Sequence, residues 1–266
     1  MEGVQTLPDQ MAAANLLRWW RDAGVDVLVG EEPRPWLRTL TPPPAGERDG
    51  REAARERGRE ADASSPEVTS LRHPLSAKDS VDAALPATLA ELLIWMAESG
   101  DVPEARWGRA RLLPSGNPQS DLMILTDMPE PDDAEAGQLL SGEVGALFDR
   151  MLAAIGLGRD TIWLSPFATI RSIGRIPSEA HRRLAEIARH QIALVAPKRL
   201  LIMGKTPNEA LIGPDWQERR GALHSLNLGA VQVETVSTFH PRLLHERPSY
   251  KAQAWKDLQL LTKGLT

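Results

Sequence analysis

The amino-acid sequence predicts an α/β fold with three layers, α/β/α, built around a central, mainly parallel four-stranded sheet. Four short apolar runs between residues 122 and 236 are each typical of a strand that is buried on both faces. Segments with apolar residues at helical spacing separate these runs, and the connectors between them are short. Repeated strand–helix alternation favours parallel strands joined by right-handed crossovers, with helices covering both faces of the sheet.

Local signals place each element along the chain. Strands are predicted at 122–125, 161–164, 199–203 and 230–236, and helices at 89–97, 142–155, 178–196, 206–212 and 249–261. The helix at 142–155 directs Leu147 and Met151 inward and is stopped by Gly156. Ser249 is the predicted N-cap of the last helix.

The first 80 residues differ in composition from the rest of the chain. An amphipathic helix is predicted at 9–23, where Trp19 and Trp20 stand side by side. This segment either packs on the main domain or uses one tryptophan to dock a protein partner. Residues 41–80 are rich in Pro, Gly, Ala and alternating charge, and such a segment cannot bury enough apolar area to offset the entropy of ordering it. We therefore expect a helix and arm at 1–40, a linker at 41–80 and the main domain at 81–266.

Composition and charge exclude several classes of protein. The formal net charge is -5, so any binding of nucleic acid requires a local basic patch. The chain contains no cysteine, which excludes disulfides, thiolate zinc sites, cysteine nucleophiles and cysteine-ligated iron–sulfur clusters. We expect no cofactor and no metal. No apolar run approaches the roughly 20 residues of a membrane span, and the N-terminus lacks a signal core, so we expect a cytoplasmic protein with no membrane contact.

Polar side chains follow three of the predicted strands where those strands end. The segments are Thr126–Asp133, Ser165–Phe167 and Thr238–Pro241. Because ligands bind beyond the carboxyl ends of parallel strands, we expect these segments to form one pocket. Asp127 is suited to orient a water, and His240 to stabilise an anionic leaving group.

Simpler interpretations of these residues remain open at this stage. Asp127 is equally well a cap or turn residue, and His240 a strand cap. Asp132 and Asp133 are expected to start a helix or to be solvated. Leu140 and Phe167 belong either to the core or to the wall of a site for a planar ligand. The candidate substrate-binding residues are Thr126, Met128, Pro129, Leu140, Ser165 and Phe167.

The segment 240–248 is the predicted nucleic-acid contact. Its His-Pro step predicts a turn and then a loop. Two leucines at the expected loop tip stand inside a rim of potential cations, which suggests contact with an anionic partner that has an apolar, stacked interior. The candidate DNA-binding residues are Arg242, Leu243, Leu244, His245 and Arg247.

Several short motifs occur in a fixed order over the last two-thirds of the chain. They are Gly116-Asn117-Pro118 before Asp121–Ile124, Gly142-x-x-Gly145 before Leu147–Leu157, Gln191–Lys198 before Met203-Gly204, and Thr238-Phe239-His240-Pro241 before Leu243-Leu244. From about Leu89 to the C-terminus, this series resembles the uracil-DNA glycosylase superfamily, most closely its family 4, the iron–sulfur branch. The resemblance implies base-excision repair by hydrolysis of the N-glycosidic bond of a flipped base such as uracil. It also implies that His240 contacts the base carbonyl as negative charge builds, and that the segment after it enters DNA.

The chain departs from the family pattern on the other wall of the site. Residues 126–130 read Thr-Asp-Met-Pro-Glu where the family usually has Gly-Glu-Ala-Pro-Gly. Leu140 replaces an aromatic ring that stacks on uracil, and Ser165 replaces an asparagine that reads its edge. Each loss is expected to cost on the order of 1–3 kcal/mol of base recognition. The cysteines of the family's cluster fall at 99–103 and near Thr169 and Leu184, so packing alone is expected to hold the fold there.

Three functions therefore remain open. The first is a DNA glycosylase with altered or weakened activity. The second is a catalytically reduced protein of the same fold that binds DNA or a repair partner. The third is a hydrolase that acts on another nucleoside-like or small ligand in the same pocket.

Overall fold

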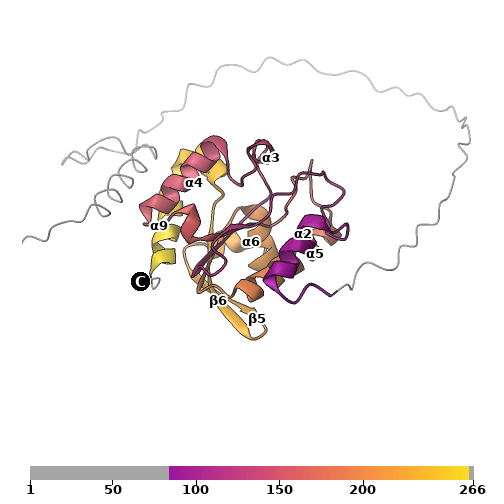
Figure 1. The fold of residues 1–266 in the computed structure, drawn as a ribbon. Helices are drawn as coiled ribbons and strands as arrows, with labels where there is room; N and C mark the ends of the chain where they lie inside the picture. The colour runs from indigo at the N-terminus through magenta and orange to yellow at the C-terminus, as the bar shows by residue number, and fades with distance from the viewer. Residues whose placement is uncertain (1–83, 264–266) are drawn as a thin grey trace, which may run out of the picture. The chain divides into compact units, whose positions relative to one another are not determined.

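The computed structural model of this chain describes residues 84–263 (Figure 1). The predictions for Trp19 and Trp20, for the arm at 1–40 and for the linker at 41–80 lie outside the described residues. No helix among residues 84–263 is both long enough and apolar enough to cross a membrane.

A six-stranded sheet forms the centre of the domain. In spatial order its strands are β1 (Ser115–Gly116), β3 (Trp163–Pro166), β2 (Leu122–Thr126), β4 (Arg199–Met203), β6 (Val231–Thr238) and β5 (Leu223–Leu228). The inner four strands are parallel, which confirms the predicted core of the sheet. The two outer strands are antiparallel to their neighbours and were not predicted.

The two outer strands lack the signal that identified the inner four. Every residue of β2 and β4 is buried, so these strands read as continuous apolar runs. In β5, by contrast, exposed and half-buried residues alternate, and β1 has only two residues, both exposed. β6 also extends past the predicted end at Val236, because Ser237 and Thr238 pair with Ile202 and Met203 of β4. Both residues are buried although they are polar.

The helices confirm the five predicted segments and add three short ones. Their bounds are α2 (Leu89–Glu98), α3 (Asp133–Ala136), α4 (Gly142–Ala154), α5 (Ser178–Val195), α6 (Lys205–Leu211), α7 (Trp216–Arg219), α8 (Pro241–Glu246) and α9 (Lys251–Thr262), with 3-10 turns η1 (Arg159–Thr161) and η2 (Pro248–Tyr250). Thr88 forms a capping box with Glu91 at the start of α2. The last helix begins at Lys251, so Ser249 lies inside η2 and is not its N-cap.

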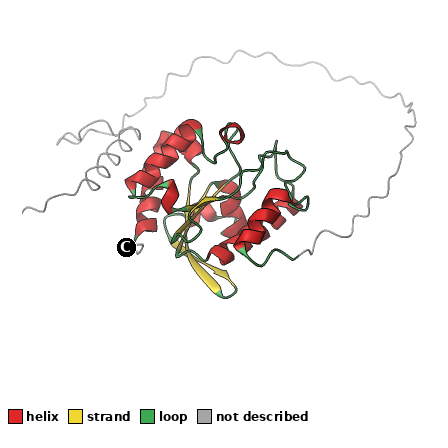
Figure 2. Ribbon diagram, viewed as in Figure 1, coloured by secondary structure: helices red, strands yellow, loops and turns green. Residues whose placement is uncertain are grey.

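Side-chain alternation along the inner strands produces the predicted three layers. Leu122 and Ile124 of β2 pack in a core with α4, α8 and α9, whereas Met123 and Leu125 pack in a second core with α5 and α6. Figures 1 and 2 show α4 and α9 on one side of the strands and α2, α5 and α6 on the other. Complete burial of an aliphatic side chain contributes about 1.5–3 kcal/mol, so these two cores position the strand ends firmly.

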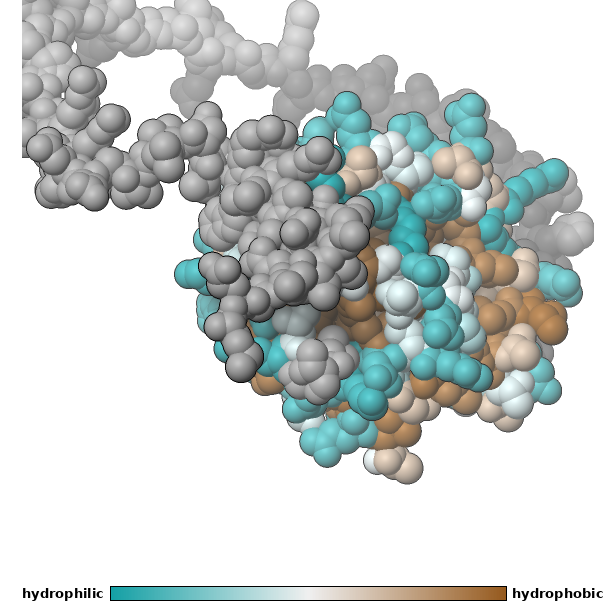
Figure 3. Space-filling view, turned by 60° about the vertical axis from the view of Figure 1, so that its left-hand side comes forward, coloured by the Kyte–Doolittle hydropathy of each residue, from teal (hydrophilic) through white to brown (hydrophobic). Residues whose placement is uncertain are grey.

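Apolar residues on the surface are interspersed with polar ones. In Figure 3 hydrophobic residues lie in patches between hydrophilic ones on the face turned to the viewer. Scattered apolar exposure of this kind is ordinary for a folded protein, so only an unusually exposed side chain calls for an explanation.

Candidate active site

Three strand ends bring a carboxylate, a glycine and an imidazole together. Asp127 follows β2, Gly204 follows β4 and His240 follows β6, and these strands are neighbours in the sheet. Gly204 has φ of 99°, a region that favours glycine. A Cβ placed on it would lie 3.5 Å from the Cβ atoms of both Asp127 and His240. Asp127 and His240 therefore both lie next to Gly204, where the positive φ rather than a lack of space favours glycine.

The protonation of His240 follows from its place at the start of α8. It is the N-cap of that helix, and its Nδ1 accepts the backbone N–H of Arg242 at 3.2 Å. Because a backbone N–H can only donate, Nδ1 carries no proton, and Nε2–H donates to Thr126 Oγ1 at 3.1 Å. Burial, and then the charge of Arg242, lower the pKa of His240 to about 3. The ring is therefore a neutral hydrogen-bond donor at physiological pH.

Two hydrogen-bond donors hold the Asp127 carboxylate, one at each oxygen. Thr206 Oγ1 donates to Oδ2 at 3.1 Å, and the Met128 N–H donates to Oδ1 at 3.1 Å. Burial raises the pKa of the Asp127 carboxyl, although the Thr206 bond and the charge of Arg242 oppose that shift. A buried, oriented carboxylate with a raised pKa is suited to accept a proton from a bound water.

Glu130 and Arg242 form a latch across the rim of the site. Nη1 of Arg242 lies 3.0 Å from each carboxylate oxygen of Glu130. Burial raises the pKa of Glu130, and the adjacent Arg242 charge opposes that rise. His240 Nδ1 lies 3.7 Å from Glu130 Oε1, but this contact is not an ion pair because the ring is neutral. Arg242, a predicted DNA contact, is thus paired with Glu130 within the protein.

Asp133 organises the turn that carries Glu130. It starts α3, as predicted, but it is completely buried and not solvated. Its two carboxylate oxygens accept four hydrogen bonds, from the N–H groups of Glu130, Leu140 and Ser141 and from Ser141 Oγ. These bonds fix the path of the chain from 130 to 141. Asp133 therefore shapes the wall of the site.

Three predicted base contacts are buried in the interior of the domain and do not line a site with Asp127 and His240. Leu140 is buried in the core with α4 and has φ of 54°, and its carbonyl accepts a bond from Arg159 at 2.7 Å. Ser165 is completely buried, and its Oγ donates to Gln191 Oε1 at 2.7 Å. Phe167 packs in the other core, with its ring 5.6 Å from that of His181. Packing partners on opposite helical layers therefore turn these side chains inward.

The remaining predicted wall residues lie at the edge of the site. Met128 is half-buried and packs against the α5 core, while its backbone N–H bonds to Asp127. Pro129 is buried, and its carbonyl accepts a bond from Arg171 Nη1 at 2.8 Å. Thr126 bonds to His240 through its hydroxyl. The side chain of Thr126 therefore contacts His240, whereas Met128 contacts Asp127 only through its backbone N–H.

The predicted loop at 240–248 is largely helical. α8 spans Pro241–Glu246 and continues into η2, because proline at the first helical position begins a helix as readily as it makes a turn. Leu244 is completely buried in the core, so it is not an exposed tip. Leu243 is half-buried. His245 is exposed and lies 3.1 Å from Glu143, and Arg247 is exposed.

A cavity of about 290 Å³ opens beside Asp127 and His240. Its other lining residues are Gly204, Lys205, Trp216, Gln217, Phe239, Arg242, Leu243 and Glu246. Trp216 and Phe239 meet edge to face, with ring centroids 6.1 Å apart. Sequence reasoning missed the wall formed by α6 and α7. The Met203-Gly204 step was a usable signal, since it marks the end of β4 beside the ends of β2 and β6.

The comparisons with known proteins agree with this architecture. Residues 113–259 match the model of the Uracil DNA glycosylase superfamily. The chain belongs to this superfamily. It is also 24% identical over 157 residues to the type-4 uracil-DNA glycosylase of Pyrobaculum aerophilum, an alignment that covers 56% of this chain and 80% of that protein.

Membership in the uracil DNA glycosylase superfamily confirms the predicted three-layer fold and supports a DNA glycosylase-like function. In this chain Asp127 and His240 lie at strand ends, where α/β proteins bind ligands. Both groups line the same cavity. The family thus supports a DNA glycosylase-like function, and the cavity gives the residues to test.

The iron–sulfur cluster of the resembled branch does not fit this member of the superfamily. Clusters are held by thiolates, and the sequence has no cysteine. Within residues 84–263 no group of three or more His, Asp or Glu residues is placed to hold a metal ion. Thr169 instead donates from its N–H and Oγ1 to Glu104 Oε1, at 3.1 and 2.9 Å. The prediction that packing alone holds this region was therefore wrong, because a buried polar contact joins it to the end of β3.

Proposed function

We propose that this chain is a DNA glycosylase that hydrolyses the N-glycosidic bond of a flipped, damaged base, uracil among the candidates. The observation that supports this most directly is the pairing of a neutral, buried imidazole with a buried carboxylate across one cavity. Family membership supports this reaction class. The assignment of Asp127 and His240 as the reacting groups is part of the proposal.

In the proposed reaction the two side chains act at opposite ends of the scissile bond. Asp127 orients a water toward the anomeric carbon of the sugar and accepts its proton as the carbon–nitrogen bond breaks. Negative charge then develops on the departing base. His240 donates its Nε2–H to a carbonyl oxygen of the base and stabilises that charge. A neutral donor suits this task because it needs no proton from solvent at physiological pH.

The resting site also explains why excision is expected to be weak. The Nε2–H of His240 is already bonded to Thr126 Oγ1, so the base carbonyl has to displace that hydroxyl. Ser165 and Leu140 are turned into the core. Without a hydrogen bond to the base edge and without an aromatic stack, base recognition is expected to lose on the order of 1–3 kcal/mol for each missing contact. Trp216 and Phe239 offer a different aromatic wall. We infer an altered base preference.

The test is the formation of abasic sites on oligonucleotides that carry uracil, hypoxanthine or xanthine. His240→Ala is expected to lower the rate by about 100- to 1,000-fold, the usual effect of removing one donor to a developing anion. His224→Ala is the matched control, because His224 lies on β5 outside the cavity. The proposal fails if no damaged base is released, or if His240→Ala and His224→Ala behave alike.

A second candidate function is DNA binding with little catalysis. It is favoured by the Thr126 contact and by the Glu130–Arg242 latch, both of which occupy groups that would otherwise meet a substrate. This alternative predicts salt-sensitive DNA binding without any abasic product. Free nucleosides in the same assay test the remaining possibility, a hydrolase of small nucleoside-like ligands.

A further inference from the structure

One aliphatic side chain of the domain is conspicuously exposed. Among residues 84–263 the large hydrophobic side chains that face solvent are Ile94 at 59%, Leu223 at 39% and Ile173 at 101% of full exposure. Ile94 lies on α2 and Leu223 on the edge strand β5. Ile173 is different because it stands at the tip of a loop, between Arg171 and Arg175. We call residues 171–175 the Ile173 loop.

The Ile173 loop lies at the carboxyl ends of the parallel strands, the same edge of the sheet as the candidate active site. It follows the end of β3, which is parallel to β2 and adjacent to it. Arg171 Nη1 donates to the carbonyl of Pro129 at 2.8 Å, which ties the loop to the wall that carries Glu130. The charge of Arg171 also contributes to the pKa shifts of Asp127 and His240. The loop is therefore anchored to the segment that follows Asp127, and Asp127 lines the cavity.

Both ends of the loop are fixed and only its tip projects. Ile170 and Ile176 on either side are buried. Thr169 is held by Glu104, and its carbonyl accepts the Leu112 N–H at 2.9 Å. Gly174 has φ of 100°, which allows the chain to turn back at the tip. An exposed isoleucine on a fixed support loses little conformational entropy when it inserts into a partner.

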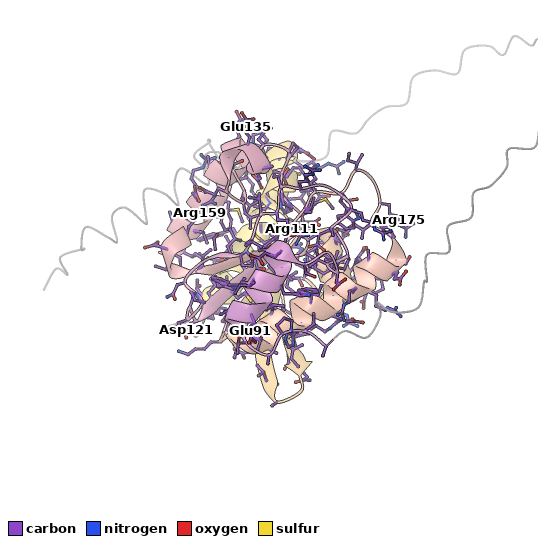
Figure 4. The ribbon with its side chains drawn as sticks, turned by 45° about the vertical axis from the view of Figure 1, so that its right-hand side comes forward. Glu91, Arg111, Asp121, Glu135, Arg159 and Arg175 are labelled. Carbon is purple, nitrogen blue, oxygen red and sulfur yellow. The ribbon has the colours of Figure 1, made fainter. Side chains whose placement is uncertain are left out.

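The flanking charges indicate the nature of that partner. Arg171 and Arg175 are both exposed. No carboxylate of residues 84–263 forms an ion pair with Arg175. Figure 4 places Arg175 at the periphery of the domain, next to the start of α5. An apolar tip between guanidinium groups matches a stacked interior between phosphates, and isoleucine is among the side chains that wedge between base steps.

We propose that the Ile173 loop is a DNA-contact element in which Ile173 enters the duplex beside the flipped nucleotide and Arg175 contacts a phosphate. This inference rests on the proposed function. It assigns to Ile173 the insertion that the sequence suggested for Leu244, a residue of α8 whose side chain is buried in the core. Substrate recognition then uses two sides of the cavity, the α8 side and the β3 side.

The experiment measures binding of the full chain to a uracil-containing duplex by fluorescence anisotropy over a range of salt concentrations. Ile173→Ala is expected to weaken duplex binding about tenfold, with a smaller effect on the single strand, because a wedge replaces stacking only in a duplex. Arg175→Ala is expected to lower the slope of log affinity against log salt by about 1. Ile94→Ala, an exposed isoleucine on α2, is the matched control.

A probe of base stacking separates insertion from simple surface contact. The fluorescence of 2-aminopurine placed next to the uracil is expected to rise on binding of the native chain and of Ile94→Ala, but less with Ile173→Ala. Equal affinity and equal fluorescence for Ile173→Ala and the native chain would overturn the inference. So would an absence of any DNA binding by the native chain.

The two proposals fail independently. If Ile173→Ala weakens duplex binding while the native chain releases no base, the proposed insertion of Ile173 is supported and the glycosylase assignment fails. If base release is normal and Ile173→Ala binds and excises as the native chain does, the wedge is wrong and the glycosylase assignment stands.

Discussion

Asp127→Asn is expected to stabilise the folded protein at neutral pH while it removes base excision. The asparagine fits the hydrogen bonds of the site. Its Oδ1 accepts the Met128 N–H, and its Nδ2 donates to Thr206 Oγ1, a hydroxyl that can accept as well as donate. The variant therefore keeps both bonds and loses only the buried negative charge.

The sign of the effect follows from the raised pKa of Asp127. Below the carboxyl pKa of the unfolded chain the group is protonated in both states, so the charge costs the fold nothing. As the pH rises through the higher pKa of the folded state, the carboxyl has to ionise in a buried position and stability is lost. Asparagine does not titrate, so its advantage over aspartate appears as the pH rises toward neutrality.

The size of the stability change for Asp127→Asn is a difference between opposing contributions. Burying a carboxylate costs several kcal/mol in real proteins. Each of the two charge-assisted hydrogen bonds contributes about 1 kcal/mol more to stability than a neutral one. The guanidinium groups of Arg242 and Arg171 offset part of the remaining burial cost. We expect a net gain of about 1 kcal/mol for Asp127→Asn, typical of relieving a strained functional site, or about 2–4 °C in Tm.

The assay is urea unfolding of the full chain at neutral pH and again at about pH 4, where the difference is expected to shrink. Asp133→Asn is the matched control, because Asp133 accepts four hydrogen bonds and donates none. An asparagine at this position would place its side-chain N–H₂ group against backbone N–H donors. The free energy of unfolding of this variant should therefore fall by about 2–4 kcal/mol. Destabilisation by Asp127→Asn at neutral pH, or a gain that does not depend on pH, would refute the reasoning.

The polar contacts support three more predictions. Thr126→Val keeps the side-chain shape and frees the Nε2–H of His240, so single-turnover base release should rise about 2- to 10-fold, the worth of one net hydrogen bond; an unchanged or lower rate would contradict this. The ring resonances of His240 should show no titration between about pH 5 and 8, because its pKa is lowered to about 3; a midpoint near 6.5 in an NMR titration would count against the neutral donor. Glu104→Ala should cost about 2–4 kcal/mol in urea unfolding, because two buried donors of Thr169 lose their acceptor, whereas Glu104→Gln should cost far less since Oε1 alone accepts both bonds.

The architecture of the domain was largely predictable because its signals are local. Runs such as Leu122–Leu125 and Leu200–Met203 are apolar along their whole length, which is what burial on both faces requires. Asp127 and His240 could be brought together on the same grounds, since parallel neighbouring strands end at one edge of the sheet. The family's motifs sit on these same elements.

The direction of individual side chains was not predictable from local pattern. Ser165 was expected in the site, but its hydroxyl bonds to Gln191 on α5, a residue 26 positions away. Leu244 was expected at a loop tip, but α8 turns it into the core. Glu130 and Arg242 lie 112 positions apart, and no spacing in the sequence predicts the latch that they form.

By itself, the sequence determined where the four inner strands and the polar segments after them lie along the chain, the absence of thiolates and the general class of fold. These properties depend on composition and on short-range periodicity. The tertiary structure decided which polar groups meet: that Thr126 holds the donor of His240, that Asp133 is buried by four hydrogen bonds, and that Ile173 rather than Leu244 faces solvent. The physical reason is that burial and hydrogen bonding depend on packing between segments far apart in the chain, which no local pattern encodes.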